Sequence, residues 1–281
     1  MLRASLIFGF LMTLVAAGLT PGDVDYQRMS NFYEDLGCLA VSGQGFYDCS
    51  NVLDTETPGK CTFQGRQFDD GEFLPTDVRL SGCKFGCVCY ASNDTQPGTF
   101  NCPEVDCPHY QPLKPGCIRA FSSLDTCCPT QIVCENEVNI TCSYGGKTFL
   151  EGEIFHPESQ RCLMCRCQDN FGLTGERDGR PKTLSEGGSC QPIPCNIGVV
   201  KMEEVNQRCA PIFMTHACCP WEFYCPSGEE RVIASDKEPG KQQCRLGSLQ
   251  LNIGDEIETK DSSLKCFCYM PPFVTCHRTG F

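Results

Sequence analysis

Cys162-Leu163-Met164-Cys165-Arg166-Cys167 and the later Cys218-Cys219-Pro220 are the stretches that decide the fold of this 281-residue chain. Both belong to a series of ten cysteines that runs from Cys142 to Cys225, which we call copy 2. The same order occurs once before, from Cys61 to Cys134 (copy 1), and a shortened series of four cysteines lies in residues 244–281 (copy 3). The chain is therefore built from two full repeats and one partial repeat of a single cysteine pattern.

The residues between the cysteines repeat as well. An apolar residue stands seven places after the first cysteine of every copy, and a glycine followed by an acid stands ten places after it. These residues are Phe68, Phe149 and Leu251, and Gly71, Gly152 and Gly254. A glycine and an acid between short apolar runs are typical of a turn between two strands, because glycine reaches positive φ without a steric clash. We expect Phe68 and Phe149 to lie in the core.

The start of the chain predicts secretion. Residues 1–18 combine Arg3, an apolar run from Leu6 to Val15 and a few small residues, which is typical of a cleaved signal peptide. The apolar run is shorter than a membrane-spanning helix requires, so we expect a soluble mature protein. In a secreted protein, an even number of cysteines at repeating positions indicates disulfides in preference to metal ligands. We therefore expect no metal and no cofactor.

Residues 19–60 precede the copies and are polar. The sequence predicts a weakly structured lead-in here, with one or two helical turns near Tyr26 to Leu36. It contains only Cys38 and Cys49, which we expect to pair with each other because no other cysteine of the 26 remains unassigned.

The two full copies resemble von Willebrand factor type C domains, also called chordin-type cysteine-rich repeats, as found in kielin- and chordin-like secreted proteins. The resemblance rests on the triplet at Cys162–Cys167, on the C-C-P sequences at Cys127–Pro129 and Cys218–Pro220, and on the Gly-acid turn before them. It extends over most of residues 61–276. Copy 1 departs from the family form at Cys83–Cys87, where the gap is one residue longer, and both copies lack the tryptophan often found before the triplet.

The residues alone leave the disulfide pairing open, but the resemblance implies an order. Within a full copy it joins the first cysteine to the fourth, the second to the eighth, the third to the fifth, the sixth to the ninth and the seventh to the tenth. The implied pairs are Cys61–Cys89, Cys83–Cys127, Cys87–Cys102, Cys107–Cys128 and Cys117–Cys134; Cys142–Cys167, Cys162–Cys218, Cys165–Cys190, Cys195–Cys219 and Cys209–Cys225; and Cys244–Cys268 and Cys266–Cys276. In copy 3 the four cysteines pair among themselves, which suggests a self-sufficient half-domain.

The fold class implied is small, disulfide-rich and mostly β, with little helix and much irregular loop. The expected divisions are the signal peptide (1–18), the lead-in (19–60), copy 1 (61–134), copy 2 (142–225) and copy 3 (244–281). Each copy has so few aliphatic residues that their burial cannot offset the chain entropy lost on folding. Disulfides must therefore supply most of the stability. Segments 135–141 and 226–243 are rich in charge, Gly and Ser, so we expect independent beads on flexible joints.

Catalysis and nucleic-acid binding find no support in the sequence. There is no nucleophile elbow, metal-type histidine cluster or phosphate loop, so we expect a non-enzyme. The formal net charge of −12 disfavours nucleic acid as a partner, although it allows a basic protein partner.

Two functions remain, and both involve binding. The resemblance implies a modulator, either antagonist or carrier, of cystine-knot growth factors of the bone morphogenetic protein and TGF-beta type. The alternative is a structural or adhesive matrix component that uses its repeats for self-association. The sequence leaves the oligomeric state open.

We expect partner contacts in copy 2, whose triplet keeps the family form. The candidates are apolar residues beside the turn and after the paired cysteines: Ile154, Phe155, Trp221, Phe223 and Tyr224. The alternative is that these side chains form the small core, and for Trp221 both interpretations stand. Two sequons, at Asn93 and Asn139, predict glycosylation.

Overall fold

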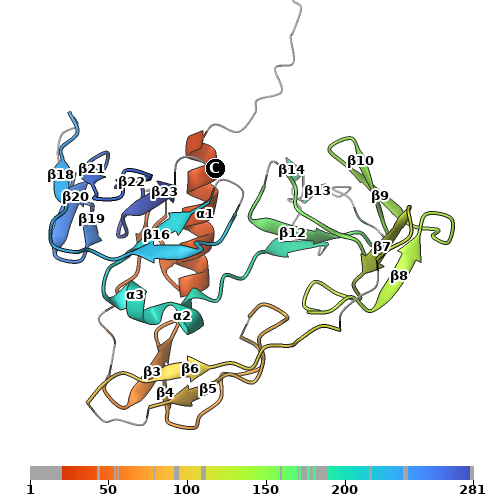
Figure 1. The fold of residues 1–281 in the computed structure, drawn as a ribbon, viewed down its shortest axis with the longest axis horizontal. Helices are drawn as coiled ribbons and strands as arrows, with labels where there is room; N and C mark the ends of the chain where they lie inside the picture. The colour runs from red at the N-terminus through yellow and green to blue at the C-terminus, as the bar shows by residue number, and fades with distance from the viewer. Residues whose placement is uncertain are drawn as a thin grey trace, which may run out of the picture.

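The computed structural model describes residues 21–42, 45–53, 55, 57–78, 80–91, 95–108, 112–158, 160–169, 171, 176–177, 180–181, 189–214, 217–236 and 240–278 (Figure 1). The predicted signal peptide and Asn93 lie outside these residues. The fold class is confirmed, because short β-strands predominate, helices are few and thirteen disulfides cross-link the chain. Within the described part, no helix is long and apolar enough to cross a membrane.

The first part of the chain forms one helix and four two-stranded sheets. They are α1 (Pro21–Leu36), β1 (Leu39–Ala40) with β2 (Tyr47–Asp48), β3 (Lys60–Phe63) with β4 (Arg66–Asp69), β5 (Val88–Tyr90) with β6 (Thr99–Asn101), and β7 (Cys117–Ala120) with β8 (Gln131–Cys134). Every pair is antiparallel, and copy 1 begins with the β3–β4 hairpin.

Copy 2 repeats this plan and adds two short helices. Its elements are β9 (Thr141–Tyr144) with β10 (Lys147–Leu150); a sheet of β11 (Ile154–Phe155), β12 (Leu163–Arg166) and β15 (Cys190–Pro192); β13 (Glu176–Arg177) with β14 (Arg180–Pro181); α2 (Ile197–Val200); α3 (Met202–Asn206); β16 (Ala210–Phe213); and β17 (Glu222–Tyr224). The remaining strands are β18 (Arg231–Ile233), β19 (Gln243–Leu246), β20 (Leu249–Asn252), β21 (Glu256–Glu258), β22 (Leu264–Phe267) and β23 (Thr275–Arg278).

The Gly-acid turn has the same hydrogen bonds in all three copies. In copy 1, the Gly71 N–H donates to the Cys89 carbonyl (2.9 Å), and the Glu72 side chain accepts from the Asp69 N–H (2.9 Å). Equivalent bonds occur at Gly152 and Gly254. The three glycines have φ of 77°, 80° and 100°, so the turn needs glycine. The acid after the glycine caps the preceding strand, which explains why the pair recurs.

Copies 2 and 3 share one sheet. Its strand order is β17-β16-β23-β22-β21-β18, and β16 runs parallel to β23. The segment 226–243 supplies β18, which pairs with β21. The expectations of a flexible joint at 226–243 and of a self-sufficient copy 3 are therefore wrong. Both edges of copy 3 would otherwise present unpaired backbone groups, and the neighbouring segments satisfy them.

Helix α1 lies in the shared core, contrary to the expected weakly structured lead-in. Its Met29, Phe32, Tyr33 and Leu36 are completely buried. They pack in one cluster with residues of copy 2 and copy 3, namely Ile197, Val205, Phe213, Met270 and Phe273. Figure 1 shows α1 running past β23 and β16, with α2 near its lower end. The helix therefore joins the lead-in to both later copies.

Two buried polar contacts fix the position of α1. The Tyr33 hydroxyl donates to the Met270 carbonyl (2.6 Å) and accepts from the Phe273 N–H (3.0 Å). The Asp35 carboxylate accepts from the backbone N–H groups of Cys195, Asn196 and Ile197 at 2.7, 3.1 and 2.7 Å. Asp35 thus accepts hydrogen bonds from the backbone N–H groups at the start of α2. In most helices these groups bond to the side chain of the residue directly before the helix.

Copies 1 and 2 also pack against each other. Ala120 and Val133 of copy 1 share a core with Leu150 of copy 2, and Val138 of segment 135–141 packs against it (Figure 1). Elsewhere Phe63 of copy 1 contacts α2. The copies therefore do not form the expected independent beads, because each buries part of its apolar surface against another copy.

Candidate functional site

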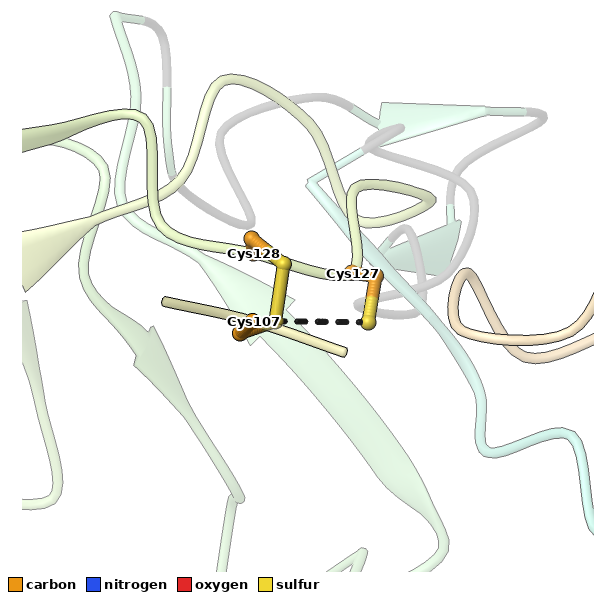
Figure 2. Close-up of side chains that lie close together, drawn as sticks. All are labelled: Cys107, Cys127 and Cys128. Atoms are coloured by element: carbon orange, nitrogen blue, oxygen red, sulfur yellow. Dashed lines mark hydrogen bonds between the residues drawn. A yellow bond between two sulfur atoms is a disulfide. The ribbon is translucent and has the colours of Figure 1, made fainter. Parts of the chain in front are cut away.

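Three sulfur atoms lie together where copy 1 is cross-linked, as Figure 2 shows for Cys107, Cys127 and Cys128. Among the described residues, this is the one group of His, Cys, Asp or Glu side chains close enough to hold a metal. However, Cys107 is bonded to Cys128, and Cys127 to Cys83, while the Cys107 and Cys127 sulfurs are 3.7 Å apart. Disulfide sulfurs have no thiolate to offer, so the cluster is a crossing of two disulfides.

Twelve of the thirteen disulfides join the pairs that the family order implies, and the thirteenth joins Cys38 to Cys49, the two cysteines that this order leaves over. In each copy, the strand after the Gly-acid turn pairs through its backbone with the strand that carries the last cysteines of the triplet. This strand, which we call the edge strand, comprises residues 72–74 in copy 1, β11 in copy 2 and β21 in copy 3. The candidate site lies on it.

Side chains of the edge strand alternate between core and surface. The inward residues are Leu74, Phe155 and Ile257, which are 7%, 6% and 5% exposed. Phe155 stacks on Phe149 with ring centroids 3.9 Å apart. The prediction of Phe155 as a partner contact is therefore wrong, because the residue after the outward position always points to the core.

The outward face of copy 1 carries large aromatic side chains. Phe73 is 62% exposed and pairs with Val88, and Tyr90, two residues further along β5 on the same face, is 55% exposed. The nearby Phe85 is 55% exposed. The sequence reasoning missed this face because it favoured the copy with the regular triplet. Phe73 takes the place of Ile154, and Tyr90 that of Gln168, so comparing the copies position by position would have found it.

The equivalent face of copy 2 is covered by the chain itself. The Phe121 N–H donates to the Gly152 carbonyl (2.9 Å), and the Arg166 Nε donates to the Phe121 carbonyl (2.6 Å). A Cβ placed on Gly152 would lie 2.7 Å from the Ala120 Cβ, whereas one on Gly71 would meet nothing within 4 Å. Ile154 is half-buried. The open face thus belongs to copy 1.

The predicted aromatic contacts of copy 2 lie in another sheet, at β17, apart from β11. Trp221 is 75% exposed, so the core interpretation of this residue is wrong. Phe223 is half-buried and packs on Phe32, with ring centroids 6.3 Å apart. Of this group, Trp221 presents the most side-chain surface.

Tyr224 is held by an internal hydrogen bond. Its hydroxyl donates to the Glu230 carboxylate (2.7 Å). Desolvation and this bond raise the pKa of Tyr224 to about 12. Desolvation alone would raise the pKa of Glu230, but the Ser227 N–H and the Tyr224 hydroxyl outweigh it and lower the pKa to about 2. Both groups therefore keep their ordinary charges at neutral pH, and Tyr224 stabilises the start of segment 226–243.

Acidic side chains border the open face of copy 1. Asp70, Glu72 and Asp77 are exposed. Asp70 also accepts from the Ala91 N–H (2.7 Å) and Glu72 caps the turn, so two of the three carboxylates are fixed in place. An aromatic face with a fixed negative border suits a basic protein surface better than an acidic one.

The predicted sequon at Asn139 is exposed at the end of segment 135–141. A sugar there would meet solvent. Its occupancy stays a prediction.

Comparisons with known proteins find distant similarity to two proteins named for von Willebrand factor C and EGF domains or for their cysteine content. No protein-family model matches it, and no solved structure matches it significantly. The chain is 27% identical over 157 residues to a von Willebrand factor C and EGF domain-containing protein of the mouse, and 27% identical over 161 residues to cysteine-rich motor neuron 1 protein of the chicken. Each match covers 56% of this chain and 12% of the relative.

These findings define the class coarsely. The chain is a disulfide-rich β protein with distant similarity, over about half its length, to von Willebrand factor C-containing proteins. The cross-linking and this similarity indicate an extracellular protein.

Proposed function

We propose that the protein is a secreted, non-enzymatic binding protein whose copy 1 contacts a protein ligand through the face of Phe73, Val88 and Tyr90. The ligand proposed is a cystine-knot growth factor of the bone morphogenetic protein type, which the protein blocks or carries. The observation that supports this proposal is the exposure of Phe73 (62%) and Tyr90 (55%) on one face of a cross-linked sheet.

Exposed aromatic side chains on a rigid support are well suited to binding. Such residues commonly supply most of the affinity of an interface, because they bury a large area at low entropic cost. Cys87 and Cys89, on the opposite face of the same strand, are in disulfides and buried. The aromatic face is therefore pre-organised. The acidic border then favours a basic ligand and faster association.

The test is a titration of the oxidised, full-length protein against an immobilised bone morphogenetic protein. We expect Tyr90→Ala to weaken binding by about 2 kcal/mol, or roughly thirtyfold, if Tyr90 is an interface hot spot. Ile132→Ala is the matched control, because Ile132 is 59% exposed but lies on β8. Trp221→Ala tests whether the exposed Trp221 of copy 2 also contacts the ligand. Equal affinities for the wild type and Tyr90→Ala would refute the assignment to copy 1.

Failure of the wild type to bind at micromolar concentration would refute the growth-factor proposal. The alternative, a matrix component that self-associates, predicts a sedimentation coefficient that rises with protein concentration. An acidic molecule with a net charge of −12 opposes its own association at low salt, so the growth-factor proposal is preferred.

A further inference from the structure

The outer side of the edge strand is occupied in copy 3, and in copy 2 the Gly-acid turn just before this strand is covered. In copy 3, β18 pairs with β21 in antiparallel register, with Arg231 opposite Glu258, Val232 opposite Ile257 and Ile233 opposite Glu256. The Ser235 N–H also donates to the Asp255 carboxylate (2.8 Å). An extended segment that precedes copy 3 in the chain therefore completes its sheet.

Copy 2 uses a shorter version of the same contact. Phe121 precedes copy 2 in the chain, and its backbone N–H donates to the Gly152 carbonyl at the start of the edge strand. The Arg166 side chain then holds the Phe121 carbonyl. In copy 3 a strand from just upstream satisfies the backbone groups of the edge, and in copy 2 a loop residue of copy 1 satisfies one carbonyl just before it.

Copy 1 has the same edge, and within the described part of the chain no segment pairs with its outer side. The Leu74 N–H donates to the Cys87 carbonyl and the Glu72 carbonyl accepts from the Cys89 N–H, each at 2.9 Å. Neighbouring residues of a strand direct their backbone groups to opposite sides, so the N–H and carbonyl of Phe73 face outward. No described strand pairs there. The upstream helix, α1, is instead buried in the core shared by copies 2 and 3.

We propose that this edge of copy 1 binds an extended segment of the partner protein, which adds to the sheet as an antiparallel strand beside Phe73. The inference rests on the proposed function and names the part of the ligand that is recognised. Main-chain hydrogen bonds supply affinity in such strand addition, and alternate side chains supply specificity.

Charge defines the chemistry of the segment. Glu72 directly precedes Phe73, Asp77 is four residues after it, and both are exposed; β18 provides the internal precedent of Arg231 facing Glu258. The segment therefore alternates basic with β-branched residues. The same carboxylates oppose pairing of two copy 1 edges with each other, because like charges directly across a sheet are destabilising.

The probe is a synthetic peptide of alternating lysine and valine, added to the oxidised full-length protein and followed by residue-resolved amide hydrogen exchange. We expect the Phe73 amide to exchange at least about tenfold more slowly with the peptide present, since it gains a hydrogen bond. Two control peptides are tested against the same wild-type protein. One replaces lysine with glutamate, and the other is N-methylated at the backbone positions that face the edge. Neither is expected to protect Phe73.

Asp77→Lys is the matched protein variant, because Asp77 is exposed, follows Phe73 by four residues and takes no part in the Gly-acid turn. We expect it to weaken binding of the lysine peptide at least about tenfold, which corresponds to about 1.4 kcal/mol. Binding without protection of Phe73, or equal binding of the N-methylated peptide, would overturn the inference. So would absence of peptide binding.

The two proposals fail separately. If the growth factor binds and Tyr90→Ala weakens it, but the growth factor leaves the Phe73 amide unprotected, the aromatic face stands and strand addition is rejected. If the peptide protects Phe73 but no growth factor binds, the edge is a strand-binding site and the ligand class is rejected.

Discussion

At the scale of single residues, the Gly-acid pair and Tyr33 each hold separate parts of the backbone together. The Gly-acid pair recurs because glycine must adopt positive φ and the acid must cap the strand before it, so both residues are visible by their spacing. The role of Tyr33 was not visible. Its two partners, Met270 and Phe273, lie more than two hundred residues away, and no local pattern encodes such a contact.

Tyr33→Phe tests this contact. The Phe273 N–H would remain buried without its acceptor, so we expect a loss of about 1–3 kcal/mol in the free energy of unfolding in urea at neutral pH. Tyr26→Phe is the control, since Tyr26 is 46% exposed. An equal effect of the two substitutions would mean that the Tyr33 hydroxyl stabilises nothing.

The pH dependence of Tyr33 has a definite sign. Burial raises the pKa of Tyr33 above its ordinary value of 10.0. The folded state therefore favours the neutral hydroxyl, and the stability it contributes is present below pH 10 and falls as the pH rises above it. In the Tyr33→Phe variant, the free energy of unfolding should fall less steeply above pH 10, because this hydroxyl can no longer ionise.

At the scale of secondary-structure elements, the strands of the copies follow from the repeat, but the partners of their edges do not. Helix α1 had a sequence pattern that was undervalued, because Met29, Phe32, Tyr33 and Leu36 recur at i, i+3, i+4 and i+7. Strand β18 gave no comparable pattern, since its three residues are all exposed and form a strand only because β21 offers an edge. Contacts between copies decide these elements.

Gly152→Ala and Gly71→Ala form a matched pair that measures the contact between copies 1 and 2. Both glycines have φ near 80°, so both substitutions carry the same backbone cost of about 1 kcal/mol. Only Gly152→Ala also meets Ala120, with a contact of 2.7 Å. We expect Gly152→Ala to cost about 1–3 kcal/mol more in thermal or urea unfolding. Equal costs would show that Ala120 does not pack on copy 2 in solution.

At the scale of the whole molecule, the fold class could be predicted from cysteine density, but the arrangement could not. Disulfides within each copy suggested beads, because every implied bond closes inside its own copy. The structure shows instead that the apolar residues left over in each copy are combined, with α1 between copies 2 and 3 and Leu150 against copy 1. Because the copies are packed in this way, the edge strand of copy 1 is the one that stays open. The candidate site therefore depends on the packing of the copies.

Amide hydrogen exchange of Phe32 and Tyr33 in the native, oxidised protein tests the shared core most directly. Both residues lie within α1 and are completely buried. We predict that their amides exchange as slowly as that of Cys276, which lies in β23 at the centre of the six-stranded sheet. Exchange of Phe32 and Tyr33 at the rate of an unstructured chain, with Cys276 still protected, would contradict the shared core and restore the arrangement of separate beads.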